Sequence, residues 1–280
     1  AQRPEAVTVL PIGVQYAWNG SIWPQLEALL RQLERDAGLT PPPGPAPLNA
    51  AGLYPRLLAL AERMLSLLER FYREAYQLEL PELELSSDAG MEVNDQLAVR
   101  LQRLVGTALE VVETSLGLRP NGDLASRCRR LEQAGWDRLF PAGTEEQGLC
   151  PLQRGLADRL AEETERRLWH MRMVENFVAV SGRYVKQLPS QERFADTLLL
   201  LWDTQCRLLG GDPMRRPRLG SRRALLRIGT AIAVDERLEG YRADRRQAVA
   251  ALTSELQQAL EGLIVPSPRL QRTAETGWTG

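Results

Sequence analysis

The stretch VTVLPIGVQYAW, Val7 to Trp18, constrains the fold most, because it is the one long β-like segment in a first two thirds otherwise patterned as helix. A lone strand leaves a row of backbone donors and acceptors unpaired, so it needs partner strands from elsewhere in the chain. Far along the sequence, SRRALLRIGTAIAV, Ser221 to Val234, is rich in Leu, Ile and Val and bounded by Gly, Pro and Arg. We therefore expect the opening segment to pair with this second strand or bent strand pair.

Apolar residues three and four positions apart predict amphipathic helices over most of the chain between these strands. The stretch LTPPPGPAP is a predicted linker, because its prolines fix extended backbone and remove donors. We expect the polar tail at the C-terminus to be disordered. The first predicted helix has Ser21 as its cap and stops at Gly38, and the others cover 53–78, 93–116, 123–139, 152–185, 191–209 and 244–264.

The predicted fold is therefore mostly α, with long amphipathic helices and a small β remnant, near 7–18 and 222–234, of an α/β domain. Two strands alone are marginal, so we expect further strands from residues that precede Ala1, and the start without Met indicates a processed, trimmed or partial chain. The expected organisation is a strand and helix of the α/β domain at 1–38, a linker at 39–47, a helical insert or domain at 48–212, a returning strand and closing helix at 213–265, and a disordered tail at 266–280.

Composition excludes several functional classes. The formal charge of -1, from 35 basic and 36 acidic residues, argues against a surface built to hold nucleic acid. Three separated cysteines and a single histidine indicate neither a disulfide framework nor a metal site, and they favour a reducing, cytoplasmic setting. No apolar run approaches the ~20 residues that a membrane-spanning helix needs.

Two short stretches are similar to catalytic or substrate-binding motifs, but each lacks a feature that its motif needs. In HMRMVE, His170 and Glu175 are five positions apart within a helical pattern, which turns their side chains about 140° away from each other. In FPAGTEE, Phe140 to Glu146, Ala142 stands where a substrate-binding carboxylate would be needed. Ser181 has no His or acid at a recognisable offset. We expect structural roles for all three, so no catalytic residue is predicted.

An arginine cluster before the second strand is the most basic stretch, and it could contact anionic head groups or a phosphate. The alternative is a solvated loop. Exposed tryptophans such as Trp23 could add peripheral membrane contact. The cluster consists of Arg215, Arg216, Arg218, Arg222 and Arg223.

The opening segment resembles a conserved block of the glycerophospholipid (PlsC-type, 1-acylglycerol-3-phosphate) acyltransferases, a strand of the form V-x-x-(L/V/I)-P-(I/V)-(G/A)-(I/V), with Pro11, Ile12 and Gly13 at its centre. The resemblance implies that these three residues bind substrate. The stretch RRALLRIGTAIAV is similar to a later strand of that family, matching it at Ile228 and Gly229, with Ala231 in place of the usual Pro. The helical segment between the two blocks looks like the long helical insert of larger bacterial members of this acyltransferase family.

The resemblance implies transfer of an acyl group from acyl-CoA or acyl-carrier protein, without another cofactor, to a lysophosphatidate-like acceptor. The family's N-H-x-x-x-x-D and F-P-E-G-T blocks precede the Pro11 block and are absent here, so we expect a C-terminal portion that is inactive by itself. Its partners would be phospholipid or lysophospholipid, at the inner face of the membrane. The alternative is a non-enzymatic helical module that binds a partner or a membrane surface. The oligomeric state stays open.

Overall fold

The computed structural model describes residues 6–44, 47–78, 93–140, 148–178 and 184–265. The described chain is mostly helical with a small amount of strand, which confirms the predicted fold class. The connector ELPELELSSDAG, the stretch FPAGTEE beyond its Phe140, Ser181 and the tail from 266 lie outside the described residues. None of the described helices combines the length and the apolar character that a membrane span requires.

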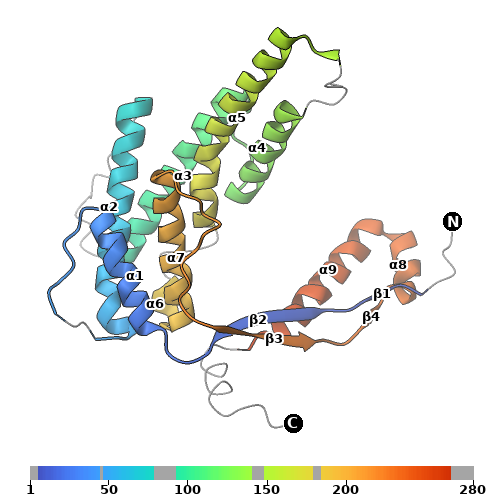
Figure 1. Cartoon of the computed structure of the whole chain (residues 1–280). Coiled ribbons are helices and arrows are strands. Elements are labelled where there is room, and N and C mark those ends of the chain that lie inside the picture. Colours follow the sequence, from blue (N-terminus) through green and yellow to red (C-terminus); the bar gives the residue numbers. More distant parts are fainter. Residues whose placement is uncertain (1–5, 45–46, 79–92, 141–147, 179–183, 266–280) are drawn as a thin grey trace. The chain divides into compact units, whose positions relative to one another are not determined.

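The elements follow the order of the chain (Figure 1). They are β1 (Thr8–Val9), β2 (Ile12–Trp18), α1 (Trp23–Asp36), α2 (Ala50–Tyr76), α3 (Val93–Leu116), α4 (Leu124–Leu139), α5 (Pro151–Val178), α6 (Tyr184–Gln187), α7 (Gln191–Leu208), β3 (Arg222–Ile228), β4 (Ile232–Ala233), the 3-10 turn η2 (Asp235–Arg237), α8 (Leu238–Ala243) and α9 (Arg245–Gly262).

The chain divides into two compact units. The helical unit is Leu26–Pro217, and the ribbon unit combines Ala1–Gln25 with Arg218–Gly280. The sequence placed its first boundary at residue 38, whereas nearly all of α1 belongs to the helical unit. The reason is the apolar stripe of α1, since Leu26 and Leu30 are fully buried and Gln205 of α7 donates a hydrogen bond to the carbonyl of Leu33 at 3.0 Å.

Side-chain caps fix where several helices of this unit begin. Asn49, Asp123 and Ser190 each accept a hydrogen bond from the backbone N–H three residues ahead, which satisfies a donor that the first turn leaves free. At the start of α2, a Cβ on Gly52 would lie 2.5 Å from the Pro47 carbonyl oxygen, so only glycine fits there. Of the helix expected over 152–185, the described residues show α5 up to Val178 and α6 from Tyr184, and 179–183 lie outside the described residues.

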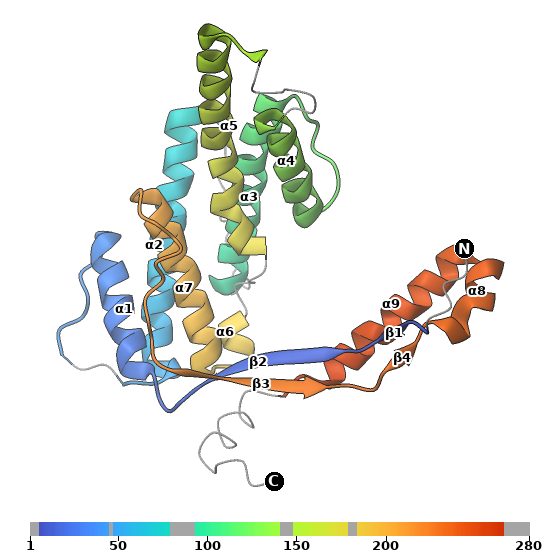
Figure 2. The ribbon, with the colours of Figure 1, turned by 45° about the vertical axis from the view of Figure 1, so that its right-hand side comes forward.

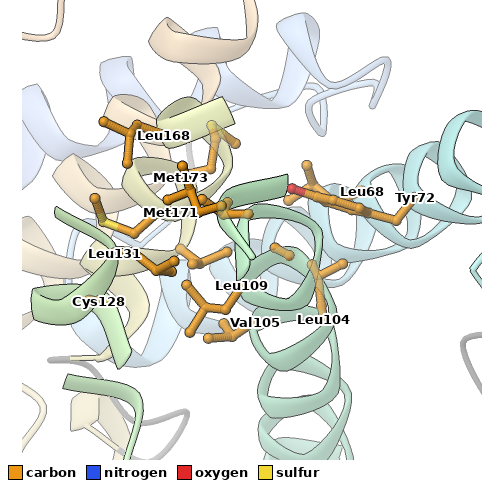
Figure 3. Close-up of a cluster of buried hydrophobic side chains, with 14 of the residues drawn as sticks. Leu68, Tyr72, Leu104, Val105, Leu109, Cys128, Leu131, Leu168, Met171 and Met173 are labelled. Atoms are coloured by element: carbon orange, nitrogen blue, oxygen red, sulfur yellow. The ribbon is translucent and has the colours of Figure 1, made fainter. Parts of the chain in front are cut away.

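One core cluster of the helical unit lies among α2, α3, α4 and α5, which run alongside one another (Figure 2). Its side chains are mostly leucine, valine and methionine at helical spacing, as the apolar pattern predicts (Figure 3). Burial of this cluster supplies the main stabilisation that the long helices need, because isolated helices are marginal in water. The members labelled in Figure 3 are Leu68, Tyr72, Leu104, Val105, Leu109, Cys128, Leu131, Leu168, Met171 and Met173.

The ribbon unit is built on the pairing that the sequence predicts. Strand β2 is antiparallel to β3, from Ile12 opposite Ile228 to Trp18 opposite Arg222, and β1 is antiparallel to β4. Among the described residues each strand has one hydrogen-bonded partner, so no third strand joins either pair. Helices α8 and α9 complete the unit.

The two strand pairs are out of register by one residue. Between the pairs Val9–Ile232 and Ile12–Ile228, two residues on one strand, Leu10 and Pro11, face three on the other, 229–231. An extra residue of this kind is a β-bulge, and it reverses which side chains point to each face. The extra residue lies on the strand that joins β3 to β4, so the alternation continues from β2 into β1 but shifts between β3 and β4, where Ile232 is buried although Leu226 and Ile228 are exposed.

Candidate functional site

The two blocks that carry the family resemblance lie directly against each other. The carbonyl of Pro11 accepts a hydrogen bond from the N–H of Gly229 at 2.9 Å, and Ile12 is the cross-strand neighbour of Ile228. More than 200 residues separate these blocks in the sequence, yet they form one structural feature. Pairing of the two blocks was expected from their β-like composition alone.

The glycines of both blocks allow the chain after α9 to pack closely on the ribbon. A Cβ on Gly13 would lie 3.0 Å from Cβ of Leu263, and a Cβ on Gly229 would lie 3.4 Å from Cβ of Pro11 and 3.5 Å from Cδ1 of Leu263. An added Cβ at Gly13 would require Leu263 to shift, whereas one at Gly229 would make ordinary van der Waals contact. None of the three motif residues Pro11, Ile12 and Gly13 has a polar side chain. They therefore determine the shape of the strand and do not take part in chemistry.

The face of the ribbon that carries Gly13 also holds the end of α9 by polar contacts. The Gln15 amide donates to the Val265 carbonyl at 3.1 Å and accepts from the Val265 N–H at 2.7 Å. Arg227 donates to the Leu263 carbonyl at 3.2 Å. These bonds satisfy backbone groups that a helix leaves free at its C-terminus, so this face is occupied.

The opposite face of β2 and β3 is apolar and exposed among the described residues, and we call it the outer face. It consists of Ile12, Val14, Tyr16, Leu226 and Ile228, whose exposed fractions lie between 46% and 68%. The alternation of β2 and the register of the pair put all five on one side. A contiguous apolar patch of this kind on a protein surface marks an interaction site.

The predicted arginine cluster does not form one site within a single unit. Arg215 and Arg216 belong to the helical unit, and Arg218, Arg222 and Arg223 belong to the ribbon unit. Arg215 pairs with Asp212 at 3.4 Å. The cluster is exposed except for the half-buried Arg223, as either interpretation of it requires.

Arg222 has the most defined position of these arginines. Its guanidinium carbon lies 3.9 Å from the centre of the Trp18 ring, a cation–π contact that orients the side chain at the end of the ribbon. The expectation of an exposed Trp23 is wrong, because Trp23 is half-buried in the first turn of α1.

His170 lies in the interior of the helical unit between two tyrosines of α2. Its Nδ1 is 2.8 Å from the Tyr72 hydroxyl oxygen, and its Nε2 is 2.8 Å from the Tyr76 hydroxyl oxygen. A neutral imidazole has one donor and one acceptor, so it bonds both hydroxyls when one accepts and the other donates. Glu175 is exposed, and the His170 ring uses the tyrosines instead.

Burial sets the protonation of this cluster. It lowers the pKa of His170 to about 4 and raises the pKa of both Tyr72 and Tyr76. All three groups are therefore neutral at pH 7, and the cluster is a satisfied polar element of the core. The sequence signal that could have located it is the pair of tyrosines four residues apart, on one face of α2.

His170 should make the helical unit less stable in mild acid. The unfolded chain takes up the imidazole proton near pH 6.5 and the folded chain only near pH 4, so this contribution is complete above 6.5 and falls as the pH drops towards 4. From pH 8 to pH 5 we expect a loss of about 2 kcal/mol from this group.

Urea unfolding of the wild type and of His170→Gln at both pH values measures this loss. The variant should lack this part of the pH dependence, since its amide does not titrate, while acidic groups elsewhere contribute equally to both proteins. The same change between pH 8 and pH 5 in both proteins would show that the buried imidazole is not the group responsible.

The described residues thus offer an uncovered apolar face on a two-stranded ribbon and a neutral, fully bonded histidine cluster in the helical core. Neither has the base, nucleophile or oxyanion donors of a complete catalytic site. Comparison of the chain with protein-family models, with curated proteins and with solved structures yields no match.

Proposed function

We propose that this chain is the C-terminal part of a glycerophospholipid acyltransferase. The whole enzyme would transfer an acyl group from acyl-CoA or acyl-carrier protein to a lysophosphatidate-like acceptor, on the cytoplasmic side of a membrane. The observation that carries the proposal is the outer face. A two-stranded ribbon with one face bonded to a helix end and the other apolar and exposed is an incomplete sheet.

Upstream residues of the whole enzyme would complete this sheet. They would add strands at a free edge of the ribbon, and upstream elements packed on the outer face would cover Val14 and Leu226. The adjacent position of the two motif blocks supports this interpretation, because in the proposed enzyme both blocks belong to one sheet.

In the proposed reaction the acceptor hydroxyl attacks the thioester carbonyl, its proton passes to a histidine base, and the thiol leaves. That base would come from the upstream N-H-x-x-x-x-D motif, with the Asp orienting the imidazole. This chain would contribute the strand shaped by Pro11 beside the substrate pocket. Arg222 and Arg223 would supply cationic donors for a phosphate.

The test uses the natural protein with its upstream residues, assayed for acyl transfer to lysophosphatidate. Val14→Asp should lower the activity more than tenfold, because it places a charge where the upstream sheet would pack. Val249→Asp is the matched control, since Val249 lies on α9 and is 51% exposed against 50% for Val14. Replacement of the upstream histidine by alanine should abolish the activity.

Two assay results contradict the proposal. One is acyl transfer that is unaffected by replacing the upstream histidine, and the other is an equal effect of the two aspartate substitutions. An upstream reading frame without N-H-x-x-x-x-D would also count against it.

A non-enzymatic interaction module is the second candidate, favoured by the first half of α5. There Leu152, Leu156 and Leu160 follow one another at four-residue spacing and are 74%, 63% and 45% exposed. Such a stripe is the apolar face that a partner helix would cover. Under this candidate the ribbon would need no upstream residues, so an upstream N-H-x-x-x-x-D motif separates the two.

A further inference from the structure

The helical unit contains an apolar pocket that is separate from the ribbon. It lies between α2, α3, α6 and α7 and has a volume of about 110 Å³. Buried side chains such as Leu57 and Leu201 form its floor, and half-buried ones such as Leu58, Ala61 and Leu97 form its rim. The pocket is therefore open to solvent along one side while its base is part of the core.

The lining excludes a charged or strongly polar ligand. Leucine, alanine, methionine and valine provide 12 of the 15 lining residues, and none of the described lining residues is charged. All three polar ones already have bonds within the protein, since the Tyr54 hydroxyl donates to Asn94 Oδ1 at 3.0 Å and Thr197 donates to the Arg193 carbonyl at 3.0 Å. Only apolar surface is left over most of the pocket for a ligand to contact.

The shape of the pocket indicates a thin, extended ligand. Along α2 its lining runs from Tyr54 to Leu68, 14 residues at a rise of 1.5 Å each, or about 21 Å. A small volume spread over that length leaves a narrow channel, which accommodates a chain of methylene groups. Apolar cavities of comparable volume bind apolar molecules.

We propose that this pocket binds one linear alkyl chain, as found in a fatty acid or in the acyl chain of a lysophospholipid. The chain lies along α2, packed between Leu57 and Leu65 on one side and Leu200 on the other, and its polar head group stays in solvent. The inference does not depend on the proposed acyl transfer, because the pocket shares no residue with the ribbon unit.

Chain length is the first test, measured by calorimetric titration of the whole protein with octanoate, decanoate and dodecanoate below their micelle concentrations. The Kd should fall by about tenfold for each two added methylenes, until the pocket is full. Absence of binding, or a Kd that does not change with chain length, would overturn the proposal.

Variants on α2 and α3 locate the binding. Ala61→Phe fills the rim and should weaken dodecanoate binding at least tenfold. Its control is Ala59→Phe, two residues away on the exposed side of α2 and outside the lining. Ala98→Phe on α3 repeats the test if Ala61→Phe does not fold, as judged by circular dichroism. Equal binding by these variants and the control would place the ligand elsewhere and refute the assignment.

A comparison of palmitate with palmitoyl lysophosphatidate identifies the source of the chain. Equal affinities would mean that the protein contacts only the alkyl chain and accepts a free fatty acid. Tighter binding of lysophosphatidate would mean that groups at the mouth also contact a phosphate. Affinity for lysophosphatidate that persists unchanged in Ala61→Phe would contradict the proposal.

Discussion

Replacement of Arg56 by alanine is expected to destabilise the helical unit by about 3–5 kcal/mol, because it leaves the buried Glu34 carboxylate without its cation. Arg56 of α2 makes two parallel hydrogen bonds to Glu34 of α1, at 2.8 Å and 2.6 Å, and a third to Glu27 at 3.0 Å. The side chains of Arg56 and Glu34 are only 11% and 5% exposed. These bonds raise the pKa of Arg56 and keep it charged in the interior.

The measurement is urea unfolding followed by circular dichroism, with the midpoint and the slope compared between variants. Arg70→Ala on the same helix is the control, because Arg70 is exposed, and it should change stability by less than about 0.5 kcal/mol. The double variant Arg56→Met with Glu34→Leu should recover much of the loss, since apolar groups can replace a buried ion pair. A loss below about 1 kcal/mol for Arg56→Ala would mean that water reaches the pair.

Truncation of Leu109 to alanine is expected to cost about 2–5 kcal/mol, because it leaves a cavity at the centre of the helical core. Leu109 of α3 is fully buried within the cluster that joins α2, α3, α4 and α5 (Figure 3). Because α3 contacts α4 and α5 closely on this side, the surrounding helices can only partly relax into the space.

Leu152→Ala provides the matched control for this second prediction. The same atoms are removed, but Leu152 is 74% exposed near the start of α5, so the change should stay within about 0.5 kcal/mol. Thermal or urea unfolding of both variants measures the difference. Equal effects would indicate that the described packing around Leu109 is wrong.

Much of the secondary structure could be predicted from the sequence, because it depends on local signals. The bounds of α3 follow from its apolar period, and Asp123 begins α4 as an N-cap. The pairing of the opening strand could also be predicted, because a strand with unpaired backbone donors and acceptors requires a partner strand.

The assignment of α1 to the helical unit could not be predicted, because it depends on a long-range contact. Glu27 and Glu34 lie one heptad apart and look like part of a solvated helix face. Only the folded chain shows that Arg56, 22 residues beyond Glu34, is bonded to both. The prolines of 39–47 suggested a domain boundary, yet they connect two helices of the same unit.

The candidate site shows the same division between local and long-range signals. The motif blocks at Pro11 and Gly229 were visible in the sequence, but the residue that packs on both, Leu263, belongs to a helix end with no motif. The tyrosine partners of His170 are more than 90 residues away from it. The one-residue offset between the strand pairs also escaped prediction, because it depends on the length of the opposing strand.

The way the chain leaves and re-enters the ribbon has a consequence for the history of such proteins. Trp18 is paired with Arg222, and just beyond them the N–H of Asn19 donates to the Ser221 carbonyl at 3.0 Å, so the chain departs and returns at adjacent positions. A turn of two residues suffices to join antiparallel strands at such a point. A single insertion or deletion could therefore add or remove the whole helical unit and leave the pairing of β2 with β3 unchanged.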